Sequence, residues 1–136
     1  FIMTFGRDFA YIGNQYHLEI FGEELFPDLL FLNRELNCMV VVELKKGAFK
    51  PAYIGQLQTY MKVLDDKVRK PHENPTIGIL LCKSANKAFV EYVIRDYNHP
   101  MGVATYKTAE DMSEELRNAL PDMDEMRKLL TDDEDV

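Results

Sequence analysis

The chain has few of the residues that form disulfides in extracellular domains or bind zinc. It contains two cysteines and three histidines among 136 residues. Cys38 and Cys82 each lie inside an apolar run, which predicts two buried thiols in a reducing, cytoplasmic compartment and not a disulfide framework. The histidines His17, His72 and His99 show no metal-ligand spacing with one another or with the cysteines. This pattern disfavours a zinc site.

Long apolar runs and glycine-rich loops are missing as well. No uninterrupted apolar stretch approaches the roughly 18 residues of a membrane span, so we expect no membrane partner. The chain begins with Phe1-Ile2-Met3, without the pattern of a signal peptide, and we expect it to be a fragment or a processed chain. Without a glycine-rich phosphate loop or a G-x-S-x-G elbow, the sequence excludes nucleotide-binding folds and serine hydrolases of those types.

The net charge of −7 lies at one end of the chain. Residues 1–106 hold 12 basic and 12 acidic side chains, whereas residues 107–136 hold 4 basic and 11 acidic ones. We therefore expect one domain over 1–106, followed by an acidic, helical tail over 107–136 that packs on the domain or trails it. The neutral body has one basic stretch, formed by Lys45, Lys46, Lys50, Lys62, Lys67, Arg69 and Lys70. Such a stretch fits a phosphate backbone, although charge alone favours a solvated helix face.

Hydrophobic periodicity predicts alternating strands and helices. The expected strands cover 9–21, 26–32, 38–44, 76–82 and 101–106, and the expected helices cover 51–69, 86–95 and 113–130. Gly13-Asn14 interrupts the first of these strands, and a turn is expected after it at Gly22-Glu23-Glu24. The first three strands have short polar connections, which favours an antiparallel meander. A helical crossover to a further buried strand then predicts an α/β fold with a mixed β-sheet flanked by helices.

Two acidic residues interrupt apolar strands. Asp28 lies within FPDLLFL and Glu43 within CMVVVEL, while Lys45 follows Glu43 on the same strand face. A hairpin centred near Glu35 sets position 28 opposite about position 42, so the two acids come within one residue of each other. Two close carboxylates repel unless a proton or a cation lies between them, and Mg²⁺ is the usual cation in phosphate chemistry. The alternative is a structural ion pair at the end of a sheet.

The expected helix over 51–69 adds two polar side chains beside these acids. Gln56 and Tyr60 are four residues apart and therefore share one helix face. Tyr60 at this spacing is equally typical of a core residue. The helix begins after Lys45-Lys46-Gly47, where free backbone N–H groups and the helix dipole favour an anion. Lys45 can position a water or stabilise charge that builds on a phosphate.

Taken together, these residues resemble the PD-(D/E)XK nuclease superfamily. Pro27-Asp28 precedes Glu43-Leu44-Lys45 by 14 residues, and the helix carries Gln56-Leu57-Gln58-Thr59-Tyr60. The stretch FPDLLFLNRELNCMVVVELKKGAFKPAYIGQLQTYM is more closely similar to the bacterial YhcG-type PDDEXK nuclease domain. The similarity continues through NPTIGILLCKSANKAFVEYVIRD and MGVATY and covers most of positions 1–130.

The resemblance implies a restriction-endonuclease-like αβββαβ core, with the first helix mostly missing here, and Mg²⁺-dependent endonuclease cleavage of DNA, with Mn²⁺ as a substitute ion. It implies that Asp28, Glu43 and the carbonyl of Leu44 bind the metal. It assigns catalysis to Lys45, with Asp28 and Glu43, and a supporting role to Gln56 and Tyr60. It further implies an N-terminal region, absent here, through which the protein forms a homodimer or binds a partner. The competing hypothesis is a catalytically inactive interaction module on the same fold.

Overall fold

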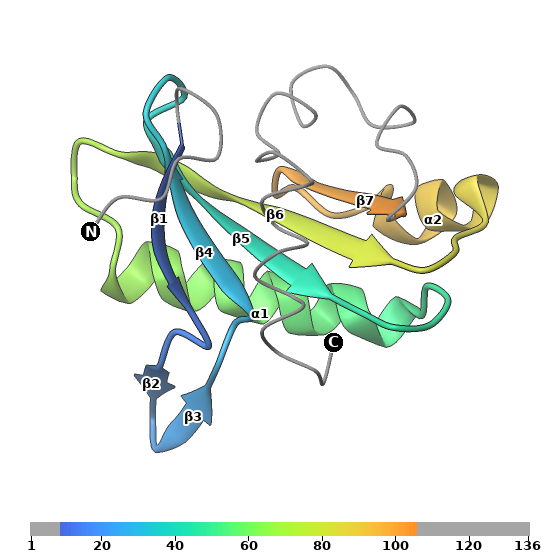
Figure 1. Cartoon of the computed structure of the whole chain (residues 1–136), viewed down its shortest axis with the longest axis horizontal. Coiled ribbons are helices and arrows are strands. Elements are labelled where there is room, and N and C mark those ends of the chain that lie inside the picture. The colour runs from blue at the N-terminus through green and yellow to red at the C-terminus, as the bar shows by residue number, and fades with distance from the viewer. Residues whose placement is uncertain (1–8, 106–136) are drawn as a thin grey trace.

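A five-stranded mixed sheet organises residues 9–105, the part of the chain that this computed structural model describes (Figure 1). The expected α/β fold is confirmed. The strand order across the sheet is β1-β4-β5-β6-β7. These strands are β1 (Phe9–Asn14), β4 (Leu29–Asn33), β5 (Cys38–Leu44), β6 (Asn74–Cys82) and β7 (Met101–Thr105).

Connection length explains the direction of each strand. β1, β4 and β5 pair antiparallel, and a short polar turn joins β4 to β5. β6 and β7 pair in parallel because helices return the chain to the same end of the sheet. The two helices are α1 (Pro51–Lys67), with Pro51 in its first turn, and α2 (Lys87–Ile94). Asn86 caps α2 by accepting a hydrogen bond from the N–H of Phe89, as its sequence position predicts.

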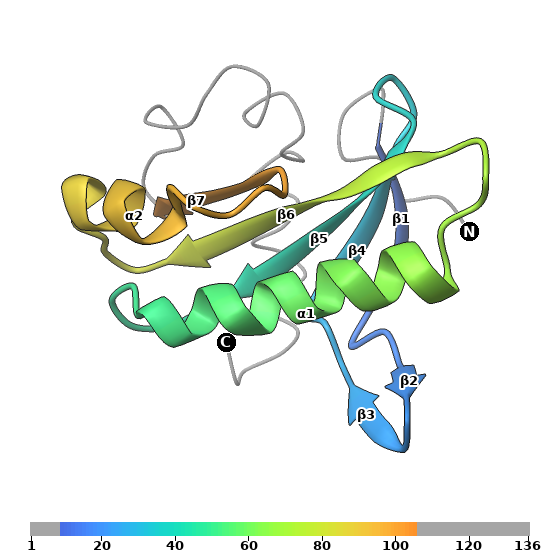
Figure 2. The same cartoon turned by 180° about the vertical axis from the view of Figure 1, so that it is seen from behind.

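The expected strand over 9–21 is wrong in one respect, because it breaks into two strands of different sheets. The chain turns at Gln15, whose φ of 48° is left-handed, and then forms β2 (Leu18–Ile20). β2 pairs with β3 (Glu23–Leu25) in a separate hairpin with Phe21 and Gly22 at its tip, both at positive φ as tight hairpin turns require. Figures 1 and 2 show this hairpin extending away from the main sheet.

The hydrophobic core is centred on β5, in which all seven residues are buried. Side chains alternate between two clusters: Val40, Val42 and Leu44 lie on one face, whereas Met39 and Val41 lie on the other. The second face is the one that α1 covers (Figure 2). Because Glu43 has the parity of Met39 and Val41, its side chain points to the α1 face.

Gly78 of β6 sets how closely α1 approaches the sheet. A Cβ at this position would meet Sδ of Met61, and would lie 3.0 Å from Cγ of Leu57. The missing side chain therefore lets both helix residues pack directly on the strand backbone. This close approach carries the N-terminal half of α1 over the end of β5.

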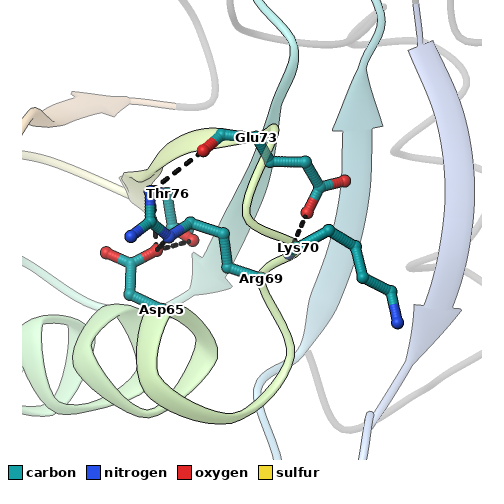
Figure 3. A network of polar contacts seen from close by, with 5 residues as sticks. All are labelled: Asp65, Arg69, Lys70, Glu73 and Thr76. Carbon is teal, nitrogen blue, oxygen red and sulfur yellow. Dashed lines mark hydrogen bonds and ion pairs between the residues drawn. The ribbon is translucent and has the colours of Figure 1, made fainter.

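A polar network fixes the other end of α1 to the start of β6 (Figure 3). The carboxylate of Asp65 accepts hydrogen bonds from the backbone N–H and the hydroxyl of Thr76, at 2.9 and 2.7 Å. Arg69 lies 3.8 Å from the same carboxylate and donates to the carbonyl of Glu73. Since Thr76 is fully buried, Asp65 satisfies polar groups that water cannot reach.

Within residues 9–105 no helix is long and apolar enough to cross a membrane. The expected helix over 113–130 and the acidic tail over 107–136 lie outside the described residues.

We expect Asp65→Ala to lower the free energy of unfolding by about 1–3 kcal/mol, because it leaves two buried donors of Thr76 without an acceptor. Asp66→Ala is the matched control, since Asp66 is an exposed neighbour in the same turn, and it should change stability by at most about 0.5 kcal/mol. Urea unfolding of both variants measures the difference. Equal stability of the two variants would show that the network does not tie α1 to β6.

Candidate functional site

The pairing of β4 with β5 brings the two predicted acids together. Leu29 is the partner of Val42, so Asp28, which directly precedes β4, lies opposite Glu43. The sequence placed the acids within one residue of each other, and the register agrees. It also placed Asp28 inside a strand, which is wrong, because β4 begins at Leu29.

Backbone hydrogen bonds connect the two carboxylates reciprocally. The N–H of Asp28 donates to Oε2 of Glu43 at 2.6 Å, and the N–H of Leu44 donates to Oδ2 of Asp28 at 2.9 Å. Each carboxylate thus accepts a main-chain N–H from the other's strand. Hydrogen bonds to ionised acceptors are the stronger kind, so this exchange holds the two groups in a defined geometry.

Glu43 is almost completely buried, with 2% of its surface exposed. Burial, and to a lesser extent the charge of Asp28, raise the pKa of its carboxyl to about 8, although the hydrogen bond from Asp28 and the charge of Lys45 oppose the rise. A carboxylate in this position is stable only with a proton or a cation beside it.

A chain of hydrogen bonds leads from Lys45 onto α1. Nζ of Lys45 donates to Oε1 of Gln56 at 2.8 Å, and Nε2 of Gln56 lies 3.0 Å from the hydroxyl oxygen of Tyr60, to which it donates. Nζ also lies 4.6 Å from the ring centroid of Tyr53, a cation–π contact. The structure therefore brings Lys45, Gln56 and Tyr60 together on the face where Glu43 lies.

Tyr60 is held as a neutral phenol. Its burial, followed by the charges of Glu43 and Asp28, raises the pKa of Tyr60 to about 12. The hydroxyl keeps its proton at any physiological pH, so Tyr60 serves as a hydrogen-bonding group. This disfavours a role for Tyr60 as a base or nucleophile.

The donor set fits a hard divalent cation that keeps part of its water shell. Among residues 9–105 there is no group of three or more His, Cys, Asp or Glu side chains suited to a metal. Two carboxylates are enough for Mg²⁺, which is usually held by one or two carboxylates together with waters and substrate phosphates. The ligand roles of Asp28, Glu43 and the Leu44 carbonyl stay predictions.

Gln15 belongs to the site, although the sequence did not identify it. Its side-chain amide donates to Oδ1 of Asp28 at 2.9 Å, and its backbone N–H donates to the carbonyl of the same residue at 2.9 Å. The pair Gly13-Asn14 indicated a break in the strand here. That composition does not reveal which side chain the turn directs at Asp28, 13 residues further along the chain.

Both cysteines are buried thiols, as predicted. Burial raises the pKa of the Cys82 thiol to about 11, more than the charge of Lys45 lowers it. A thiol that stays protonated is a poor nucleophile, so Cys82 is a packing residue.

The family described as the YhcG PDDEXK nuclease domain matches residues 1–121. "Putative nuclease YhcG" of Escherichia coli (strain K12) is 33% identical over 107 residues, which is 79% of this chain and 28% of that protein. The chain therefore spans little more than a quarter of this curated relative.

Two solved structures are similar at lower identity. A repair endonuclease from Pyrococcus abyssi is 18% identical, over 73% of this chain and 38% of the other, with a TM-score of 0.47. The EndoMS-dsDNA2 complex is 19% identical, over 72% and 35% of the two chains, with a TM-score of 0.46.

The raised pKa of Glu43 predicts that the metal-free protein loses stability as pH rises. The unfolded chain releases this proton near pH 4.5, whereas the folded protein keeps it to about pH 8. The folded state therefore binds more protons between these values, and its stability falls through that window before levelling off. Glu43→Gln carries no titrating proton, so it should not share this loss.

Urea unfolding in EDTA at pH 5 and pH 8 measures the effect. The variant should gain on the order of 3–4 kcal/mol over the parent between these two pH values, at about 1.4 kcal/mol per pKa unit. Titrating groups that do not interact with Glu43 behave alike in both proteins and cancel in the difference. Parallel pH curves would contradict the raised pKa.

Proposed function

The chain belongs to the family of YhcG PDDEXK nuclease domains, and from this premise we propose that it is a Mg²⁺-dependent endonuclease domain that hydrolyses phosphodiester bonds of DNA. The observation that carries the proposal is the reciprocal contact of Asp28 with Glu43 and Leu44, beside a lysine that α1 holds on the same face. Among the described residues, this is where a buried carboxylate with a strongly raised pKa meets a second carboxylate and a lysine.

Asp28 and Glu43 are the proposed ligands of the ion, with the carbonyl of Leu44 as a third. PD-(D/E)XK nucleases generally use divalent metal ions. The pKa of Glu43 supports this assignment, because a cation at the site replaces the proton that the buried carboxylate otherwise retains. When bound, Mg²⁺, or Mn²⁺ in its place, supplies charge for the phosphate and acidifies a water.

Lys45 acts on the phosphate or on the attacking water. Its ammonium group donates hydrogen bonds to a non-bridging phosphate oxygen or orients the attacking water. The oxygen of that water bonds to phosphorus and its proton passes to solvent, while the bond to the leaving oxygen breaks and this oxygen takes up a proton from solvent. Gln56 holds Nζ of Lys45 at 2.8 Å, and the ring of Tyr53 restricts it from one side. Tyr60 in turn fixes the amide of Gln56. Preorganisation of this kind lowers the barrier because little reorientation is needed during the reaction.

DNA is the proposed substrate and partner. Lys46 and Lys50 are exposed at the start of α1, next to Lys45, where backbone N–H groups and the helix dipole also favour a phosphate. A cytoplasmic location is proposed with it, because two buried cysteines that form no disulfide are typical of a reducing compartment. Homodimer formation, or a partner bound through a further N-terminal region, also stays a prediction.

Lys45→Met should reduce the cleavage of plasmid DNA in Mg²⁺ by about 10²–10³-fold, the usual cost of removing one preorganised group. Metal affinity should hold or rise slightly, because a positive charge beside the cation is lost. Lys46→Met is the matched control, since Lys46 is the exposed next residue, and it should retain near-parental cleavage. Cleavage at the parental rate by Lys45→Met would exclude a catalytic lysine.

The same variants distinguish the nuclease hypothesis from the hypothesis of a catalytically inactive interaction module. If Lys45 serves only as a counter-ion of the acids, Lys45→Met should destabilise the metal-free fold by about 3–5 kcal/mol, as breaking a buried ion pair does. In the catalytic assignment its metal-free melting temperature stays close to that of the parent. Absence of cleavage by the full-length parent on supercoiled, single-stranded and branched DNA would favour the interaction module.

Mg²⁺ or Mn²⁺ should raise the melting temperature of the parent in a dose-dependent way, because a ligand that binds only the folded state stabilises it by about 2.7 kcal/mol at one hundred times its Kd. Glu43→Gln removes one charged ligand and should abolish this rise. Thermal melting across a metal titration at pH 7.5 is the measurement. An equal rise in both proteins would show that the ion binds elsewhere.

A further inference from the structure

We propose that Gln15 is a positioning residue, whose side-chain amide fixes the Asp28 carboxylate in the orientation that binds the divalent cation. This inference rests on the proposed function and names a residue of that site outside the PD…E-x-K and Gln/Tyr positions. It concerns metal affinity, which can be measured without any cleavage assay.

The backbone around Asp28 is held by contacts outside the β4–β5 ladder. β4 begins one residue later, at Leu29, and β3 ends at Leu25. Gln15 donates its backbone N–H to the carbonyl of Asp28 at 2.9 Å, and Tyr16 donates to the carbonyl of Pro27 at 3.2 Å. The turn at Gln15 thus holds the segment that joins the hairpin to the sheet.

Two donors hold the carboxylate of Asp28, one on each oxygen. The amide of Gln15 donates to Oδ1 and the N–H of Leu44 donates to Oδ2, both at 2.9 Å. With one hydrogen bond on each oxygen, the plane of the Asp28 carboxylate is fixed. A carboxylate offers about four lone-pair sites, so two remain for a cation and its waters.

The left-handed backbone at Gln15 makes this contact depend on the local fold. With φ at 48°, Gln15 has a conformation that glycine and asparagine adopt more readily than glutamine. A glutamine here is unfavourable for the backbone alone, and the contact with Asp28 gives a physical reason for its presence. The amide is also neutral, so it orients the carboxylate without adding a positive charge that would compete with the cation.

Two variants separate the side chain from the backbone. Gln15→Asn keeps an amide and tolerates positive φ, but it is one methylene shorter and does not reach Oδ1 of Asp28. Gln15→Gly tolerates the same φ and has no side chain at all. Asn14→Ala is the matched control, because Asn14 is the exposed preceding residue, at the end of β1.

The measurement is Mn²⁺ affinity by isothermal titration calorimetry, with the metal-free melting temperature of each variant recorded alongside. We expect Gln15→Asn and Gln15→Gly to bind Mn²⁺ about tenfold more weakly, the lower end of the range for partners of ligating groups. The metal-free melting temperatures should stay within about 2 °C of the parent, as is usual for surface substitutions. Cleavage by both variants should need about tenfold more Mg²⁺ than cleavage by the parent.

The outcomes distinguish failure of the role of Gln15 from failure of the proposed metal-dependent function. If the parent binds Mn²⁺ and both variants bind it equally well, Gln15 does not position Asp28 and the inference is overturned. If weaker binding comes with a large fall in melting temperature, Gln15 acts on the fold, and the inference is again overturned. If the parent itself binds no Mn²⁺, the metal-dependent function fails first and the inference fails with it.

Discussion

The burial of the Glu43 carboxylate between the sheet and α1 is the constraint on which the rest of the site depends. An acid with 2% exposure is tolerated only where donors, a proton or a cation meet its charge. The main chain of Asp28 supplies a donor, and the carboxylate of Asp28 adds a second negative charge on the same face. The two carboxylates together make the site electrostatically negative. Positive groups are therefore stabilising here, and the structure places a lysine and a helix N-terminus beside the proposed cation.

The helix α1 is anchored at one end of the sheet and positions the side chain of Lys45 at the other end. Its last turns are tied to the start of β6 through Asp65 and Thr76, and its middle rests on Gly78. Its first turns present Gln56 to Lys45. A rigid helix anchored at a distance fixes the lysine more accurately than a loop could, and the accuracy of the proposed site is therefore partly a property of contacts that lie outside it.

Much of this arrangement could be predicted from local pattern. An acid within each of two apolar runs, the two-residue spacing of Glu43 and Lys45, and the i,i+4 spacing of Gln56 and Tyr60 are features that a sequence displays directly. The hairpin β2–β3 and the role of Gln15 could not be predicted, because both depend on left-handed backbone at Gln15, Phe21 and Gly22. Gly13-Asn14 and Gly22 indicate interruptions of this segment, but they do not show which residues take the left-handed conformation, because glutamine and phenylalanine seldom adopt it.

The register between β4 and β5 also acts as a safeguard during folding. A slip of one residue in either strand turns its side chains to the opposite face, which would separate Asp28 from Glu43 and break both reciprocal hydrogen bonds. A misfolded copy of the chain therefore has no assembled pair of carboxylates. For the proposed endonuclease, correct pairing of β4 with β5 is therefore a precondition of cleavage, so that quality control of the fold would also be quality control of the activity.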